Sequence, residues 1–260
     1  MVVGDQVGQS KGETVSEVDA ESAQVIHIIA GPTGVGKSTA ATELARVTGA
    51  PIVVADRIQC FTDLATTSAR AGDEEAGVQR VRLAERTVAD GDFTAADALD
   101  SLIGTLRELG ERHPLLIVEG GSISLLWDFA ELLPELGFRA TARLMHIGDR
   151  QEYVARLTRR ARRMLIPEGS GTSTLEELAI AWKNVDQRPF VASVNGFGAI
   201  LEWCATHSVA VESLASAALS EEQVDELARL IAIRHAEHGV LQDRIFSMVF
   251  DAFEPLTPAA

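Results

Sequence analysis

The sequence contains little cysteine, little positive charge and no long hydrophobic run. Only two of its 260 residues are cysteines, Cys60 and Cys204, too few for the disulfide frameworks of small secreted domains. Lysine and arginine number 23 against 38 aspartates and glutamates, and a net charge of -15 argues against a broad binding surface for long nucleic acids. No apolar run approaches the roughly 20 residues that span a bilayer, and no secretory signal opens the chain. We therefore expect a cytoplasmic protein with reduced thiols that binds neither a membrane nor a long nucleic acid; nothing in the sequence indicates its oligomeric state.

What the sequence does contain is a polar start, then alternating strand and helix patterns, then a helical remainder. Residues 1–24 are polar and aperiodic, which predicts a flexible N-terminal arm. Residues 25–148 predict an α/β core with a parallel sheet flanked by helices, and residues 149–260 predict a helix-rich C-terminal part packed on the sheet in the same unit. The expected strands are 25–30, 51–55, 114–122 and 142–147, and the expected helices are 37–48, 76–89, 94–112, 125–133, 150–165, 175–182, 199–207 and 221–250.

A phosphate-binding motif lies between the first expected strand and the first expected helix. The segment GPTGVGKST, residues 31–39, fits the pattern G-x-x-x-x-G-K-[ST] through Gly31, Gly36, Lys37 and Ser38. Its glycines let backbone N–H groups curl around phosphate oxygens, and the helix N-terminus adds partial positive charge. Lys37 can neutralise a phosphate oxygen, and the Ser38 hydroxyl can reach Mg²⁺. Because a strand precedes the motif and a helix follows it, we interpret it as a P-loop in a P-loop NTPase-like fold rather than as an empty glycine-rich turn.

Two carboxylates follow later buried strands. Glu119, in LLIVEGG, lies where P-loop kinases and ATPases place an acidic partner for Mg²⁺. Asp56 ends the strand pattern 51–55, at the carboxyl edge where ligand crevices open in parallel sheets. An aspartate there can also serve as a helix N-cap. We interpret Asp56 as functional because we expect its strand to lie beside the P-loop strand.

Five segments occur in a distinctive order along the chain: GPTGVGKST, ADRIQC with TTSAR, VEGGSISLL, RRARRML and HAEHGVLQDRIF. Together they resemble the adenylate isopentenyltransferases of plant-associated bacteria, which synthesise cytokinins. The likeness runs from about residue 25 to about residue 253, and DRIQC and EGGSISLL are its most specific parts. In that family the P-loop grips dimethylallyl diphosphate while an adenine amine attacks the allylic carbon. The resemblance implies transfer of a dimethylallyl group from its diphosphate to the N6 amine of AMP, the first step of cytokinin biosynthesis, with Mg²⁺ as cofactor.

The resemblance also implies roles for single residues, and general chemistry agrees with them. An exocyclic adenine amine is a poor nucleophile, so Asp56 would act as the general base that removes its proton. Thr33 would contact the leaving bridging oxygen, and Lys37 would contact the diphosphate. The diphosphate would be bound by Gly31, Thr33, Gly34, Gly36, Lys37, Ser38, Thr39 and Arg160, with Ser38 also at the metal. The nucleotide would be bound by Asp56, Arg57, Ser68, Arg70, Gly121 and Ser122, and the prenyl-donor pocket would include His235 and His238.

Several of these residues have a simpler structural interpretation. Arg57 is equally well a solvated charge, and Gly121 with Ser122 can be a tight turn and helix cap. The arginines of helix 150–165 are expected to form mostly a solvated face, with Arg160 as the one that reaches the site. His235 and His238 have the spacing of a metal pair, but no third ligand accompanies them in the sequence.

Other activities also stay open at this point. A tRNA dimethylallyltransferase shares the loop and the chemistry, but the acidic charge and the lack of an inserted domain between Asp56 and Glu119 disfavour it. A P-loop small-molecule kinase would use the same loop for ATP, and a binding protein would use it without turnover. The sequence leaves AMP, ADP and ATP open as acceptors. The donor is open as well, because polar His238 favours a hydroxylated prenyl chain and apolar Ile180 disfavours it.

Overall fold

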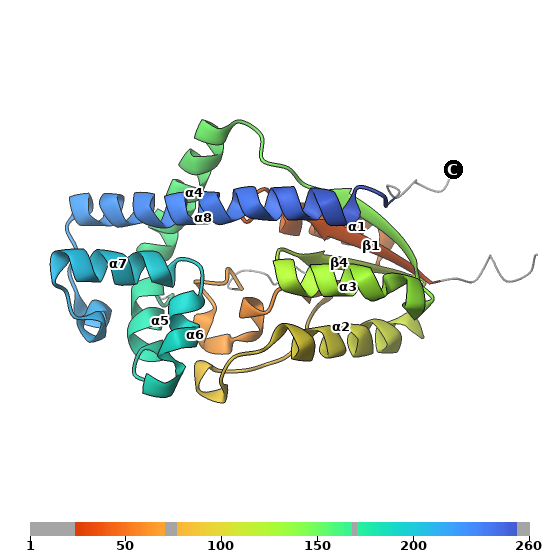
Figure 1. Cartoon of the computed structure of the whole chain (residues 1–260), viewed down its shortest axis with the longest axis horizontal. Helices are drawn as coiled ribbons and strands as arrows, with labels where there is room; N and C mark the ends of the chain where they lie inside the picture. The colour runs from red at the N-terminus through yellow and green to blue at the C-terminus, as the bar shows by residue number, and fades with distance from the viewer. Residues whose placement is uncertain (1–23, 71–76, 168–170, 254–260) are drawn as a thin grey trace, which may run out of the picture.

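A five-stranded parallel sheet forms the centre of the computed structural model, which describes residues 24–70, 77–167 and 171–253 (Figure 1). The strand order is β3-β2-β4-β1-β5. The strands are β1 (Val25–Ala30), β2 (Ile52–Ala55), β3 (Arg80–Arg82), β4 (Leu115–Gly120) and β5 (Arg139–Leu144). Helices cover both faces of this sheet, and β1, β2 and β4 are accordingly almost completely buried, as expected for near-continuous apolar strands. The carboxyl ends of these three strands lie at one edge, and the candidate site lies there.

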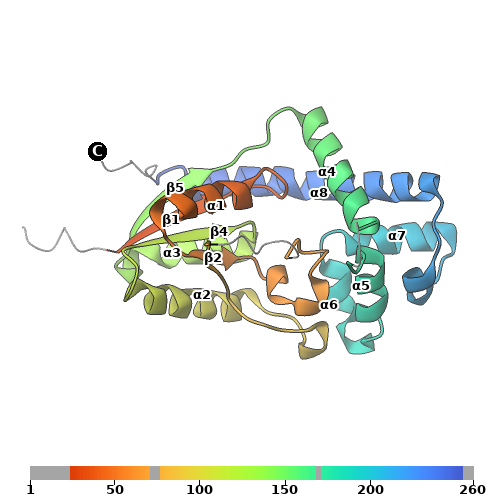
Figure 2. The same ribbon diagram turned by 180° about the vertical axis from the view of Figure 1, so that it is seen from behind.

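Helices cover the two faces of the sheet (Figures 1 and 2). They bury separate apolar clusters. On one face, α1 (Lys37–Thr48) packs its alanines against Ile29, Ile52 and Ile117. On the other face, α2 (Ala95–Gly110) and α3 (Ile123–Leu136) contribute to the main core. The leucine spacing of α2 places Leu102, Leu106 and Leu109 on its buried side, which fixes how the helix sits on the sheet.

The remainder of the described chain is helical. It comprises α4 (Arg150–Leu165), α5 (Thr174–Ala181), α6 (Arg188–Ser193), α7 (Phe197–His207) and α8 (Glu221–Phe250). Helix α8 has 30 residues and runs from the helical part back along the sheet, where it contacts α4, α3 and β5 (Figures 1 and 2). The expected α/β fold with a helix-rich part packed on the sheet is therefore confirmed. Short 3-10 turns occupy Ile58–Cys60, Thr62–Leu64, Val88–Asp90, Val185–Gln187 and Val211–Ser216.

Two of the expected elements are wrong, and both errors lie in edge strands. The helix expected over 76–89 is replaced by β3 and the turn at Val88–Asp90, because β2 has a free edge and β3 pairs with it in parallel, Ile52 opposite Arg80. Residue 76 lies outside the described residues. The strand expected over 142–147 instead covers Arg139–Leu144, because β5 pairs residue for residue with β1, from Val25 opposite Arg139 to Ala30 opposite Leu144.

Two further expectations concern the strand order and the N-terminus. Strand β2 does not lie beside β1, because β4 lies between them. The premise that Asp56 follows the strand next to the P-loop strand is therefore wrong, although both strands end at the same edge. The arm expected over residues 1–24 lies, apart from Gln24, outside the described residues. No helix in the described part of the chain has the length and apolar character needed to cross a bilayer.

Candidate active site

The P-loop turns from the end of β1 into the N-terminus of α1. Gly36, at the N-cap of α1, has a φ of 103°, a left-handed conformation that glycine adopts without strain. Lys37 is the first residue of the helix, and its Nζ donates a hydrogen bond to the Pro32 carbonyl at 2.8 Å. Burial lowers the pKa of Lys37, while Glu119 and Asp56 act in the opposite direction. The lysine is thus held at the base of the loop, within reach of the two carboxylates.

Ser38 and Glu119 meet beneath the P-loop. Ser38 Oγ donates a hydrogen bond to Glu119 Oε1 at 3.2 Å, and Arg80 Nη1 lies 3.6 Å from Glu119 Oε2. Oε2 is buried and accepts no hydrogen bond from the described residues. Burial also raises the pKa of Glu119, because the charged form loses its hydration. A hydroxyl and an incompletely satisfied carboxylate are hard oxygen ligands, so this pair fits the requirements of Mg²⁺.

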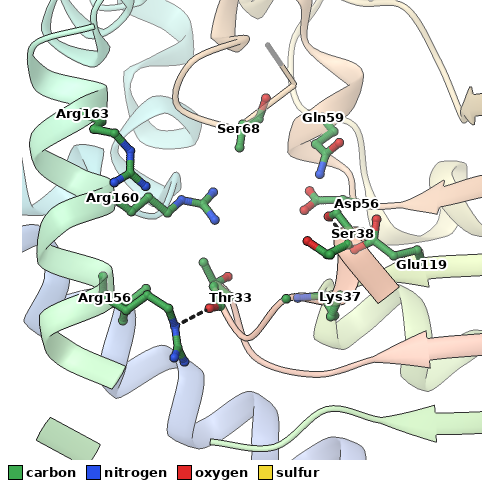
Figure 3. Close-up of a pocket in the computed structure, with 16 residues that line it drawn as sticks. Thr33, Lys37, Ser38, Asp56, Gln59, Ser68, Glu119, Arg156, Arg160 and Arg163 are labelled. Atoms are coloured by element: carbon green, nitrogen blue, oxygen red, sulfur yellow. Dashed lines mark hydrogen bonds between the residues drawn. The ribbon is translucent and has the colours of Figure 1, made fainter. Parts of the chain in front are cut away.

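Asp56 follows β2 and faces the P-loop across a cavity. Its Oδ1 accepts a hydrogen bond from the Ile58 N–H at 3.0 Å, which fixes the side chain at the start of the turn Ile58–Cys60. In Figure 3 its carboxylate lies opposite Arg160, which extends from α4 into the cavity. Asp56 therefore forms a local hydrogen bond to the loop and also lines the cavity, but it is not the N-cap of the turn, which is Arg57.

Three arginines of α4 close the cavity opposite the strands (Figure 3). Arg156, Arg160 and Arg163 lie at i, i+4 and i+7, which places them on one face of the helix. Arg156 Nε donates to the Gly34 carbonyl at 2.8 Å, so the helix also contacts the P-loop directly. The expectation that these arginines form mostly a solvated face is confirmed, because Arg156, Arg159 and Arg163 are exposed, but Arg156 and Arg163 line the cavity as well as Arg160. Arg162 pairs with Glu221 and Asp225.

The cavity has two connected lobes. The first lobe, about 310 Å³, is lined by Thr33, Gly34, Gly36, Lys37, Ser38, Thr39, Asp56, Gln59, Ser68, Ala69, Glu119, Gly121, Arg156, Leu157, Arg160 and Arg163. The second lobe, about 390 Å³, shares six of these residues, which are Thr33, Lys37, Asp56, Ser68, Gly121 and Arg160. It adds Arg57, Ile58, Thr67, Ser122, Ile123, Ser124, Phe190, Ser193, Val194, Asn195, His235, His238 and Gln242. The lining of the first lobe holds one lysine and three arginines against two carboxylates, so this lobe suits an anion although the whole chain is acidic.

The second lobe contains both histidines expected at the prenyl-donor pocket. Burial lowers the pKa of His235 and of His238, which favours neutral imidazoles at neutral pH. His235 Nδ1 lies 2.9 Å from the Ile231 carbonyl and donates to it, because a carbonyl can only accept. Among the described residues, no group of three or more His, Cys, Asp and Glu side chains could hold a metal ion, so the pair has no third ligand of these types there.

Most of the expected site residues line this cavity, and two do not. Gly31 directly follows β1 and is not among the residues that line either lobe. Arg70 is directed elsewhere, because it donates to the Gln59 carbonyl at 3.0 Å and pairs with Glu85. Arg57 lines the second lobe and also lies 3.4 Å from Asp92. The roles assigned to all these residues stay predictions.

Sequence reasoning missed part of the lining. Arg156 and Arg163 could have been predicted from the sequence, since helical spacing places them on the same face as Arg160. Phe190, Ser193, Val194 and Asn195 carried none, because they come from the short helix α6 and the loop after it, which no pattern predicted. Ile180 is 51% exposed and is not in the lining of either lobe, so in this structure it does not argue against a hydroxylated donor.

Comparison with known proteins gives a consistent set of relatives. The family model described as isopentenyl transferase matches residues 24–254. An adenylate dimethylallyltransferase of Rhodococcoides fascians is 47% identical over 228 residues, which is 87% of this chain and 89% of the relative. An adenylate dimethylallyltransferase of Rhizobium rhizogenes is 31% identical over 90% of this chain and 97% of the relative.

Solved structures with a similar fold are tRNA-modifying enzymes. A eukaryotic dimethylallyltransferase acting on tRNA aligns with a TM-score of 0.63 and 13% identity, covering 89% of this chain and 73% of that chain. A tRNA isopentenylpyrophosphate transferase of Staphylococcus epidermidis aligns with a TM-score of 0.63 and 12% identity, covering 85% of this chain and 90% of that chain. At these identities the likeness shows the fold alone.

Proposed function

The chain belongs to the isopentenyl transferase family and is a prenyltransferase, and we propose that it transfers a dimethylallyl group from dimethylallyl diphosphate to the N6 amine of AMP. This reaction would be the first step of cytokinin biosynthesis. The observation that supports it most is a P-loop and a carboxylate, Asp56, facing each other across a cation-lined cavity. Such a cavity suits a reaction in which one substrate loses an anion and the other loses a proton.

On the donor side, the P-loop would hold the leaving diphosphate. As the allylic C–O bond breaks, negative charge develops on the bridging oxygen, and fixed cations and N–H groups stabilise it without reorganising. Lys37 and Arg160, which line both lobes, would bind the diphosphate, and the Thr33 hydroxyl would contact the bridging oxygen. Arg156 and Arg163 add positive charge on the opposite wall of the first lobe.

On the acceptor side, Asp56 would hold the N6 amine and accept its proton as the new C–N bond forms. The products are then N6-dimethylallyl-AMP and diphosphate, with the proton on Asp56. The lone pair of the amine is delocalised into the adenine ring, so a positioned base contributes typically 10²- to 10⁴-fold to the rate. Asp56 lines both lobes, so it would be accessible to a substrate bound in either of them.

Mg²⁺ belongs to the same proposal. Ser38 and Glu119 would hold it, since they present a hydroxyl and a buried carboxylate oxygen without a hydrogen bond from the described residues. The ion would supply charge neutralisation for the diphosphate. We also place the reaction in the cytoplasm, where buried free thiols such as Cys60 and Cys204 are usual.

The test is a product assay analysed by mass. The enzyme is incubated with Mg²⁺, AMP and dimethylallyl diphosphate, in parallel with ADP or ATP as acceptor and with the hydroxylated donor. The expected product is prenylated AMP with release of diphosphate. Release of ADP from ATP without any prenylated nucleotide would refute the proposal and support a kinase.

A tRNA acceptor is the second candidate, because the same fold occurs in solved enzymes that act on tRNA, although a shared fold does not identify the acceptor. The acidic charge of -15 argues against it, because binding to a nucleic-acid backbone draws on clustered lysine and arginine. The relatives of higher identity are adenylate enzymes by name. An unmodified tRNA added to the same assay decides between the two, since prenylation of tRNA in preference to AMP would reverse the assignment.

A further inference from the structure

Gln242 of α8 joins the two loops that border the cavity. Its side chain is almost fully buried, at 2% exposure. Oε1 accepts a hydrogen bond from the Thr33 N–H at 3.0 Å, and Nε2 donates one to the Gly121 carbonyl at 2.6 Å. The orientation of the amide follows from these partners, because an N–H requires the oxygen and a carbonyl requires the NH₂ group. One side chain therefore spans from the P-loop to the turn after β4.

The backbone of Thr33 is held by side chains from two helices of the C-terminal part, α4 and α8. Its N–H is bound by Gln242 on α8, and its carbonyl accepts a hydrogen bond from Tyr153 Oη on α4 at 2.8 Å. The Thr33 N–H is thus taken by the protein rather than directed at a phosphate. With both backbone groups fixed, these two contacts hold the Cα atom from which the hydroxyl side chain extends, and Thr33 lines both lobes.

The other end of the amide lies beside the P-loop lysine. A Cβ added to Gly121 would lie 3.1 Å from Gln242 Nε2 and 3.4 Å from Lys37 Nζ, so the three groups meet at one point. The residues that follow Gly121, from Ser122 to Ser124, line the second lobe. A change in the distance between the P-loop and this turn would therefore move the walls of both lobes relative to each other.

We propose that Gln242 is a positioning residue for the transfer reaction, whose amide fixes the distance between Thr33 and Gly121 and holds the Thr33 hydroxyl against the leaving bridging oxygen. The inference rests on the proposed function. Misplacement of a reacting group by about 1 Å can cost roughly 100-fold in rate, so a rigid amide bridge has a measurable kinetic effect.

The test replaces the amide without changing its size much. Gln242→Met keeps a long unbranched side chain but removes both hydrogen bonds, and Gln242→Asn keeps the amide but is too short to reach both partners. Gln151→Met makes the same chemical change at an exposed position of α4. For each variant we would measure kcat, the KM values, and the affinity and stoichiometry for inorganic diphosphate by calorimetry. The stoichiometry reports the fraction of folded protein.

The decisive comparison is made in a Thr33→Ala background. We expect Gln242→Met to lower kcat about 10- to 100-fold at unchanged diphosphate stoichiometry, with the same trend for Gln242→Asn and no effect for Gln151→Met. In the Thr33→Ala background the Gln242→Met replacement should change kcat less than about threefold, because the hydroxyl that Gln242 would position is already absent. A kcat that is unchanged in the single variants, or that falls by the same factor in both backgrounds, would overturn the inference.

The two proposals can fail separately. If the wild-type enzyme gives no prenylated AMP, the proposed function fails, and diphosphate binding then decides the role of Gln242. Weaker binding in Gln242→Met, by about fivefold or more at unchanged stoichiometry, would support the positioning of the P-loop. Equal binding in the variant and the wild type would overturn it.

Discussion

Replacing Asp56 by asparagine tests the proposed chemistry with little effect on the fold. The substitution exchanges one carboxylate oxygen for an NH₂ group of similar size. The retained oxygen can still accept the hydrogen bond from the Ile58 N–H, which is 3.0 Å long in the wild type. We therefore expect the free energy of unfolding to change by less than about 1 kcal/mol.

The expected effect on the rate is much larger than the effect on stability. An amide cannot accept the proton of the adenine amine, so turnover should fall by roughly 10² to 10⁴, which corresponds to about 3 to 5 kcal/mol of activation free energy. Diphosphate binding should not weaken, because the substitution removes a negative charge near Lys37 and Arg160.

The assay is single-turnover formation of prenylated AMP at saturating substrates, with calorimetry on inorganic diphosphate for the same protein. Asp100→Asn, an exposed position in α2, is the matched control. Turnover within about threefold of the wild type would refute Asp56 as the general base. Loss of diphosphate binding together with turnover would show instead that Asp56 organises the donor side.

Three further predictions concern the P-loop lysine and the sheet. Lys37→Ala should weaken binding of inorganic diphosphate by about 10- to 100-fold, the value of one charge-assisted hydrogen bond, and unchanged affinity in calorimetry would contradict the P-loop assignment. Gly120→Ala should destabilise the fold by about 3 kcal/mol or more in urea unfolding, because its Cβ would lie 2.1 Å from the Ala55 carbonyl oxygen, and a stable variant would show that the strands can separate there. Burial holds the pKa of His27 at about 4, below its ordinary value of 6.5, so the unfolded chain takes up this proton first as the pH falls. The free energy of unfolding should therefore fall by roughly 2 kcal/mol, after solvent screening, as the pH falls from about 6.5 to about 4. His27→Gln should reduce this pH dependence in urea-unfolding experiments. An unchanged pH dependence in the variant would exclude His27 as its cause.

The parts of the site that sequence reasoning located are those carried by local patterns. The P-loop spacing, the carboxylates at the ends of apolar strands and the basic helix are each readable within one segment, and the structure brings Lys37, Asp56 and Arg160 to one cavity. The signals for helix ends also lie within one segment, and α1, α4 and α8 begin and end at the expected residues. The spacing of residues along the chain is therefore enough to predict a feature that lies within a single helix, strand or loop.

The parts that sequence reasoning missed depend on contacts between distant segments. Strand β3 carries arginines at both ends, and it forms because β2 offers a partner and because Arg80 Nη2 donates to the Ser38 carbonyl and to Thr42 Oγ1, at 3.1 and 2.7 Å. The amide of Gln242 reads as an ordinary polar residue of a helix until α8 is packed against the P-loop. Neither strand β3 nor the Gln242 bridge is indicated by a sequence pattern within its own segment.

The hydrogen bond between Thr33 and Gln242 joins residues 209 positions apart, and this separation has a consequence for biosynthesis. A ribosome adding about 5 to 20 residues per second needs roughly 10 to 40 s to pass from the first residue to the second. During that time the sheet and α1 can fold, but the amide that bridges the loops does not yet exist. We therefore expect the nascent chain to acquire a folded sheet before a completed active site, so the substrates would meet a working enzyme only after helix α8 has been synthesised.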